Sequence, residues 1–381
     1  MPYPDFRNEH QVARRPHHIV PALASVRVIM VYQTYPSVPG TCDAGLSNTV
    51  LSTMRVLRQA GVHCESWGIR HVGELYVRLV ADEDARPARP ITHVVINTPS
   101  FVWPLPTRET PTPESIIEFA SRWQEIIFVQ LNHSGMAFLS IDLFGVKHIR
   151  EALDLSVRLH NVAVAGNNSR FVRWTSEGLK KQSVLLPNLY DMAGAVNPVM
   201  PYPNPNPIRV GAFGAGRPWK NPLVAGEAAL VIGNRLRVPV ELNINSGRWD
   251  GDGGLNLAAA LDELYANLAG ATLIKVPWQS EPAFLHTVST VDVLLNISFD
   301  ETFCAIVANG CWAGTPSVVG PAIEWAPKSW MCWNPEDPGE VARVAIGLLH
   351  DRVGAVHDGR EALSRYVNAG VTRWIDYLTG G

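Results

Sequence analysis

One carboxylate and one amide interrupt an otherwise apolar stretch near residue 300. The segment SFDETFCAIVANGCWAGTPSVVG (298–320) follows the apolar run VDVLLNIS (291–298), and Glu301 stands in the loop after that run. At the carboxyl end of a strand, a carboxylate faces the ligand crevice of an open α/β sheet and can accept hydrogen bonds from hydroxyls. Asn309 lies about two helical turns further on, so we expect it on the same cleft-facing side. An acidic helix cap and a buried polar spacer are the structural alternatives for this pair.

A second cluster suits an anionic ligand. In GAFGAGRPWKN (211–221), Gly214 and Gly216 allow close backbone approach, while Arg217 and Lys220 supply positive charge near a helix start. Backbone N–H groups, a helix dipole and two cations together suit a diphosphate. The alternative is a glycine-rich turn with solvated cations. The spacing is not G-x-G-x-x-G and no acidic residue follows at the required distance, which disfavours a nicotinamide cofactor.

A histidine and an acidic loop complete the candidate residues. His133, in LNHSG (131–135), ends a predicted strand and is expected to point into the cleft, although a lone histidine is also a common structural residue. DGDGG (250–254) looks like a metal loop, but it lacks further spaced acids and is interpreted as a surface turn. With no D-x-D motif in a position to hold a metal, we expect no metal site.

These residues need a scaffold that brings strand ends together, and the periodicity predicts one. Apolar β-branched runs alternate with helical patterns, which is typical of βαβ units and parallel sheets covered on both faces. The predicted strands are 26–33, 92–98, 125–133, 162–167, 183–188, 208–214, 238–245, 272–278, 291–298 and the run PSVVG. The predicted helices are 46–61, 113–123, 145–160, 220–236, 255–268, 282–290, the segment after Glu301, 337–350 and 358–378.

The alternation predicts an α/β protein with two Rossmann-like domains facing across a cleft. Residues 192–207 carry five prolines and no charge, and they are interpreted as a linker. The expected parts are an N-terminal arm (1–25), a first Rossmann-like domain (26–191), this linker, a second Rossmann-like domain (208–355) and a C-terminal helix (356–381) that packs back on the first domain.

Four landmarks in order resemble one family. The 298–320 segment is similar to the signature of retaining GT-B glycosyltransferases, the large family that includes sucrose synthases and many bacterial sugar transferases. GRPWK resembles that family's diphosphate-gripping G-R-x-x-x-K region but is one residue shorter. LLPNLYD (185–191) resembles the I-P-N-G-V-D that ends the first domain. GTCDAGLSNTV (40–50) stands where the family has its first-domain glycine-rich loop.

The resemblance implies that the first domain (26–191) binds the acceptor and the second (208–355) binds the nucleotide sugar, and it implies a role for each matching position. Arg217 and Lys220 would hold the nucleotide diphosphate, together with the glycine loop at Gly214 and Gly216. Glu301 would bind donor-sugar hydroxyls, and His133 would lie near the donor sugar and the acceptor. The remaining implied positions are the main chain of Thr302, Phe303 and Cys304 at the phosphates and the loop glycines Gly40 and Gly45. Asn309 replaces the glutamate that takes the ribose hydroxyls in this family, so it loses a charge-assisted hydrogen bond.

Composition limits the class of protein. The chain of 381 residues has a net charge of −3, 46% hydrophobic and 18% charged residues, so no global charge indicates a nucleic-acid or membrane-surface protein. The five cysteines show no metal spacing, and we expect free buried thiols. No segment approaches the ~18 apolar residues of a membrane span. We expect a cytoplasmic protein.

The function implied by the resemblance is transfer of a sugar, with retention, from a nucleotide diphosphate sugar, most simply a UDP-sugar, without a metal or other cofactor. The acceptor stays open among a glycan, a small molecule and a modified DNA base. A nucleotide-sugar epimerase, a sugar phosphorylase and a non-catalytic nucleotide-sugar-binding protein are the alternatives, and the last follows from the departure at Asn309.

Overall fold

The first domain is built on a parallel sheet. The computed structural model describes residues 23–34, 44–97, 113–140, 145–193 and 206–380. Six strands lie in the order β2-β1-β3-β4-β5-β6. They are β1 (Arg27–Gln33), β2 (His63–Ile69), β3 (His93–Ile96), β4 (Ile127–Asn132), β5 (Val162–Gly166) and β6 (Val184–Leu185). Its helices are α1 (Ala44–Gln59), α2 (Val72–Ala85), α3 (Pro113–Arg122), α4 (Met136–Leu139), α5 (Gly145–Arg158) and α6 (Ser169–Arg173).

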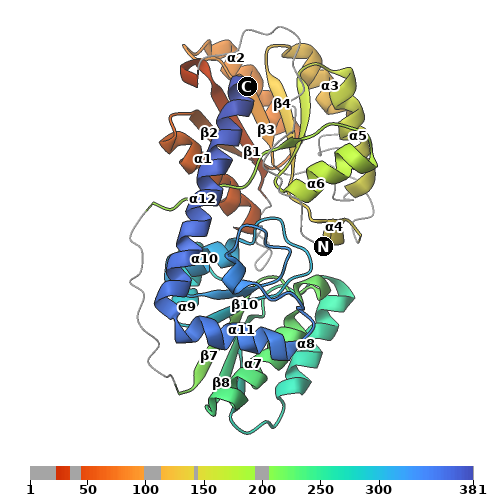
Figure 1. Cartoon of the computed structure of the whole chain (residues 1–381). Coiled ribbons are helices and arrows are strands. Elements are labelled where there is room, and N and C mark those ends of the chain that lie inside the picture. The colour runs from red at the N-terminus through yellow and green to blue at the C-terminus, as the bar shows by residue number, and fades with distance from the viewer. Residues whose placement is uncertain (1–22, 35–43, 98–112, 141–144, 194–205, 381) are drawn as a thin grey trace.

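Both faces of this sheet are buried, as the continuous apolar strands predict. Alternate residues of a strand point to opposite faces. Val28 and Met30 of β1 therefore join a core that contains residues of α1. Ile29 and Val31 join a second core, formed with α2, α3 and α5. The helices divide between the two faces in the same way in Figure 1.

The second domain has a parallel sheet of five strands in the order β11-β10-β7-β8-β9. The strands are β7 (Ile208–Ala212), β8 (Val240–Asn245), β9 (Ala271–Val276), β10 (Val293–Asn296) and β11 (Ser317–Val319). The helices are α7 (Pro222–Leu236), α8 (Gly251–Tyr265), α9 (Glu281–Ser289), α10 (Ala305–Ala313) and α11 (Pro338–His350). The chain leaves β7 toward β8 on one side and later returns to β10 on the other. The strand order therefore reverses between β7 and β10, where open α/β sheets bind ligands.

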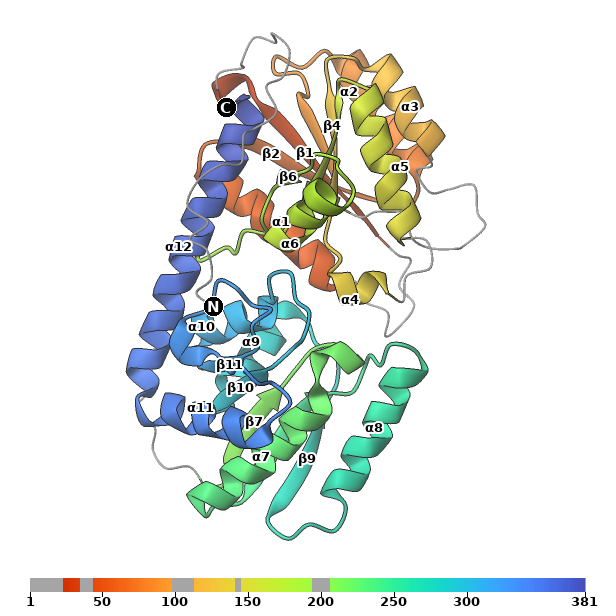
Figure 2. The same cartoon turned by 45° about the vertical axis from the view of Figure 1, so that its right-hand side comes forward.

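A single long helix runs along both domains. Helix α12 (Arg352–Thr379) contacts α10 and α11 of the second domain and extends beside the first (Figures 1 and 2). Near its end, the buried Trp374 donates a hydrogen bond from its indole nitrogen to the Pro187 carbonyl oxygen at 2.8 Å. The Tyr377 ring lies edge-on to His93 of β3. The last part of the helix thus packs on the first domain.

The sequence predicts most elements but not all. The periodicity misses β2 and α2, whose mixed polar and apolar residues show no clear pattern. Helix α8 begins at Gly251 rather than 255, and α12 at Arg352 rather than 358. The start of α12 is capped by Asp351, whose side chain accepts a hydrogen bond from the Gly354 main-chain nitrogen at 3.1 Å. Cys64, Cys304, Cys311 and Cys332 are free and buried, as predicted. The N-terminal arm, Gly40 and most of the 192–207 segment lie outside the described residues.

Candidate active site

A small hollow lies at the carboxyl ends of β7, β8 and β10. The loop after β7 forms one wall, and Gly214 in it has a φ of +119°, which side chains rarely adopt. Its main-chain nitrogen donates to Asn245 Oδ1 at 2.8 Å. The polar residues that line the hollow are Lys220, Asn245, Asn296 and Ser298. The side-chain nitrogen of Asn296 is buried without a hydrogen-bond partner among the described residues.

Lys220 and Glu301 form an ion pair beside this hollow. Lys220 ends a short 3-10 helix (Pro218–Lys220) after the glycine loop, and Glu301 stands in the loop after β10. The Lys220 ammonium contacts Glu301 Oε1, and Ser298 Oγ lies 3.5 Å from the same oxygen. The side chains are 21% and 10% exposed, so the pair is poorly screened. The structure thus brings together two residues for which the sequence predicts different roles: Lys220, predicted to bind phosphate, and Glu301, predicted to bind sugar hydroxyls.

Arg217 precedes Lys220 by three residues and is held by an acidic residue. Its Nε donates to Asp250 Oδ2, and its guanidinium lies over the rings of Phe138 and Trp219 at 5.3 and 5.6 Å. Burial opposes ionisation of Asp250, but Arg217 and Arg248 outweigh it and lower the pKa of the carboxyl. The interpretation of residues 250–254 as a surface turn is therefore wrong. Asp250 is partly buried, stands just before α8 and holds the Arg217 side chain.

Gly216 has a packing role in this structure. A Cβ at this position would lie 1.9 Å from the Trp249 ring, and the two residues pair as an isolated parallel bridge. The glycine therefore allows Trp249 to close over the loop.

The segment between Glu301 and α10 is held by aromatic packing. Phe303 stacks against Trp325 and Tyr366, and its carbonyl accepts from the Trp325 indole nitrogen at 2.6 Å. Cys304 has a φ of +62°, in the left-handed region that favours glycine. At the start of α10 the main-chain nitrogens of Val307 and Ala308 already donate to the Cys304 carbonyl at 3.1 and 3.4 Å, so at most the N–H groups of Ala305 and Ile306 stay open to a ligand. They are suited to an anion.

Asn309 and Glu301 have different hydrogen-bond partners. It lies within α10, is buried, and accepts a hydrogen bond from Tyr190 Oη at 2.8 Å. Tyr190 belongs to the LLPNLYD segment that ends the first domain. Burial raises the pKa of Tyr190, which keeps the hydroxyl as a donor. The described contacts place no hydrogen bond between Asn309 and Glu301.

His133 follows β4 and is held between residues that follow the neighbouring strands. Asn97 donates its side-chain nitrogen to the carbonyls of Val31 and Val95, which leaves Oδ1 to accept from His133 Nε2 at 3.1 Å. Asn167 Nδ2 lies 3.3 Å from His133 Nδ1. These bonds assign the Nε2–H tautomer. Burial lowers the pKa of His133 to about 4, so the ring is neutral at pH 7.

The other predicted residues are placed as follows. Gly45 lies in the first turn of α1. Among the described residues, no group of three or more His, Cys, Asp or Glu side chains could hold a metal ion. No helix in the described ranges has the length and apolarity needed to span a membrane. Sequence reasoning missed Tyr190 and Asp250 as site residues, although both stand in segments that the sequence singles out, LLPNLYD and DGDGG.

The fold has known counterparts, although no family model matches the chain and no curated sequence matches it significantly. OtsA, a trehalose-6-phosphate synthase, superposes with a TM-score of 0.59 at 10% identity over 92% of this chain and 98% of that chain. S. aureus TarM, in complex with α-GlcNAc-glycerol and UDP, gives 0.54 at 11% identity over 76% of this chain. This chain spans 55% of the TarM chain. An E. coli trehalose-6-phosphate structure bound with UDP-2-fluoro glucose gives 0.52 at 10% identity over 93% and 97%. The chain has the GT-B fold, as predicted.

Proposed function

We propose that this protein is a glycosyltransferase that takes a sugar from a nucleotide diphosphate sugar, with a UDP-sugar as the expected donor. The contact between Lys220 and Glu301 carries the proposal, because it joins a cation suited to a phosphate and a carboxylate suited to sugar hydroxyls where the strand order of the second sheet reverses. The UDP and UDP-2-fluoro glucose bound by structural neighbours support it.

The chemistry follows from charge. Donor cleavage leaves a nucleotide diphosphate, whose developing charge is stabilised by Arg217, Lys220 and the start of α10. Lys220 would exchange its contact with Glu301 for one with the diphosphate, and this exchange would free the Glu301 carboxylate to accept donor-sugar hydroxyls. The aromatic packing of Phe303 holds the loop in place, so little reorganisation is needed. We propose transfer with retention and without a metal.

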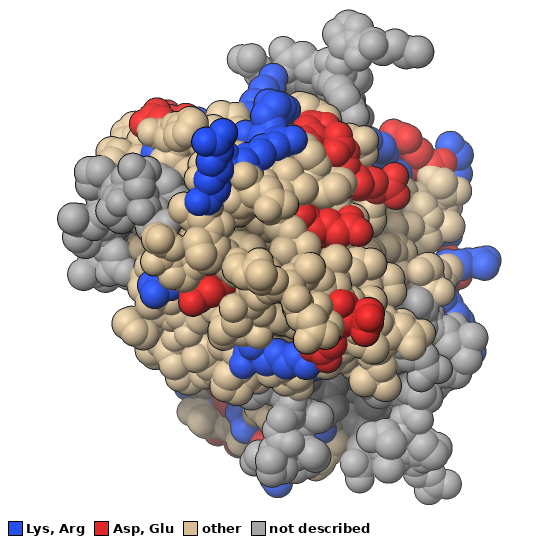
Figure 3. All heavy atoms as spheres, turned by 90° about the horizontal axis from the view of Figure 1, so that it is seen from below, with Lys and Arg blue, Asp and Glu red and all other residues tan. Residues whose placement is uncertain are grey.

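The acceptor is proposed to be a glycan or a small hydroxyl compound. TarM was solved with a sugar–glycerol compound, and OtsA makes a disaccharide phosphate by name. A DNA acceptor has no such support. On the face of the molecule seen from below, basic and acidic side chains are interspersed on a largely uncharged surface (Figure 3).

A panel of UDP-, GDP- and ADP-sugars tests the proposal. We expect slow release of UDP from one UDP-sugar and faster release when sugar acceptors are added. We also expect NMR to show that the anomeric configuration of the product is the same as that of the donor. Activity should survive treatment with EDTA. Absence of both binding and release across the panel would overturn the proposal.

A non-catalytic nucleotide-sugar-binding protein is the second candidate. The observation in its favour is that Asn309 replaces a ribose-binding glutamate of the resembled family and is already bonded to Tyr190. Tight binding of a UDP-sugar without turnover, with acceptors present, would decide for this candidate.

A further inference from the structure

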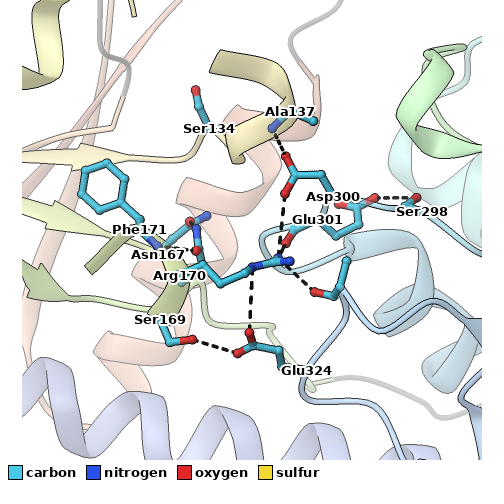
Figure 4. A network of polar contacts seen from close by, with 12 residues as sticks. Ser134, Ala137, Asn167, Ser169, Arg170, Phe171, Ser298, Asp300, Glu301 and Glu324 are labelled. Atoms are coloured by element: carbon cyan, nitrogen blue, oxygen red, sulfur yellow. Dashed lines mark hydrogen bonds and ion pairs between the residues drawn. The ribbon is translucent and has the colours of Figure 1, made fainter. Parts of the chain in front are cut away.

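We propose that Arg170, in the first domain, is a positioning residue for the Glu301 loop (residues 298–304) of the second domain. Arg170 Nη2 donates to the main-chain oxygen of Glu301 and to that of Ala322, the latter at 3.1 Å (Figure 4). The inference rests on the proposed function, because it gives Arg170 a role in placing the Glu301 carboxylate.

The position of Arg170 is fixed by its own domain. Helix α6 follows β5, and its start is capped by Asn168, whose side-chain oxygen accepts from the Phe171 main-chain nitrogen at 3.0 Å. The cap sets the direction in which α6 leaves the sheet. The Arg170 side chain, 29% exposed, then reaches the second domain, where Asp300 and Glu324 lie 4.0 and 3.8 Å from its guanidinium nitrogens.

A second contact holds the same loop. Asp300 Oδ2 accepts a hydrogen bond from the Ala137 main-chain nitrogen of α4 at 2.7 Å. A Cβ at Gly135 would lie 2.1 Å from this oxygen, so the glycine permits the approach. Ser169 adds a bond to Glu324 at 2.9 Å. Helices α4 and α6 thus hold residues 300 and 301 from the first-domain side.

The two sides of Glu301 have different partners. Its carbonyl oxygen is bonded to Arg170 of the first domain, whereas its carboxylate is paired with Lys220 of the second. The residues proposed to bind the diphosphate, Arg217 and Lys220, make their ion pairs within the second domain. We therefore expect the contacts between the domains to affect the position of the Glu301 carboxylate more than they affect the affinity for the nucleotide. Misplacement of a reacting group by about 1 Å is enough to lower turnover by roughly 100-fold.

The test is Arg170→Ala, with Arg158→Ala as the control. Arg158 is an exposed arginine at the end of α5 in the same domain. We expect kcat to fall by roughly 10- to 100-fold in Arg170→Ala, with the Kd for UDP within about twofold of wild type and partial recovery in Arg170→Lys. Arg158→Ala should match wild type. Unchanged kcat, or a Kd that rises as much as kcat falls, would overturn the inference.

Hydrogen exchange separates this inference from the proposed function. Faster exchange confined to peptides covering 134–140 and 298–304 is expected in Arg170→Ala, and it can be measured even if no turnover is found. Unchanged exchange there would refute the positioning role, whatever the activity. If Arg170→Ala does not fold, Gly135→Ala provides the second variant, because its methyl group displaces Asp300, and the same exchange and kinetic results are required of it.

Discussion

Lys220 and Glu301, 81 residues apart in the chain, form an ion pair at the carboxyl edge of the second sheet. The ammonium belongs to the glycine-rich loop after β7 and the carboxylate to the loop after β10. These strands are neighbours in the sheet. Each group is the ion-pair partner of the other, and we predict that a bound donor separates them.

The first prediction concerns the carboxylate. Glu301→Ala should lower sugar transfer by about 100-fold or more, because donor hydroxyls lose their acceptor. The Kd for UDP should stay near the wild-type value or fall, since Lys220 then has no competing partner. Coupled detection of UDP release and isothermal calorimetry measure the two quantities. Glu241→Ala, which removes a partly exposed partner of Arg209, is the control. Wild-type turnover in Glu301→Ala would contradict the site.

The second prediction concerns the cation. Lys220→Ala should raise the Kd for UDP by about tenfold, equivalent to roughly 1.4 kcal/mol, because a charge-assisted bond to phosphate is lost. Lys275→Ala removes an exposed lysine of the same domain that pairs with Asp262, and it should leave the Kd unchanged. Calorimetry with UDP at constant ionic strength compares them. Equal effects from both lysines would show a nonspecific charge effect instead.

The third prediction concerns Asn309 and Tyr190. Each of Asn309→Ala and Tyr190→Phe should lower the free energy of unfolding by about 1–2 kcal/mol, since each removes one partner of a buried hydrogen bond. The double variant should cost less than the sum. Urea denaturation of the wild type, the two single variants and the double variant measures the free energies of unfolding for this double-mutant cycle. If Asn309 instead binds ribose, Asn309→Ala would weaken UDP binding and the double-mutant cycle would show no coupling.

The fourth prediction concerns Gly216. Gly216→Ala should lower the free energy of unfolding by about 1–3 kcal/mol, because the new methyl group overlaps the Trp249 ring. Gly347→Ala is the matched control: nothing lies within 4 Å of its Cβ position in α11, so alanine should be neutral or slightly stabilising. Denaturation midpoints compare them. Equal stability of the two variants would mean that Trp249 moves freely.

The fifth prediction concerns pH. The pKa of His133 is lowered to about 4 by burial, below the ordinary value near 6.5. Between these values the unfolded chain binds more protons than the folded one, so the His133 contribution is fully present above pH 6.5 and is lost as pH falls toward 4. The loss amounts to roughly 2–3 kcal/mol. In His133→Gln the decline should be shallower by this amount. Parallel declines in both proteins would contradict the neutral, buried ring.

Much of the fold was predictable because its signals are local. The apolar run at residues 26–33 predicts a strand, and the helical spacing at residues 113–123 predicts a helix. A parallel sheet must be covered on both faces, which predicts how such elements pack. The sequence did not predict β2 and α2, because their residues show only a weak pattern. Their burial depends on neighbouring elements that their own residues do not specify.

The sequence alone determined the class of scaffold and the residue types at its strand ends: a glycine loop with Arg217 and Lys220, and a carboxylate at Glu301. Only the tertiary structure decided their partners. It pairs Lys220 with Glu301 and turns Asn309 toward Tyr190, and it brings Arg170 from the other domain to the Glu301 loop. Spacing along a chain describes one element at a time, whereas these contacts depend on how strands order in a sheet and how two domains approach.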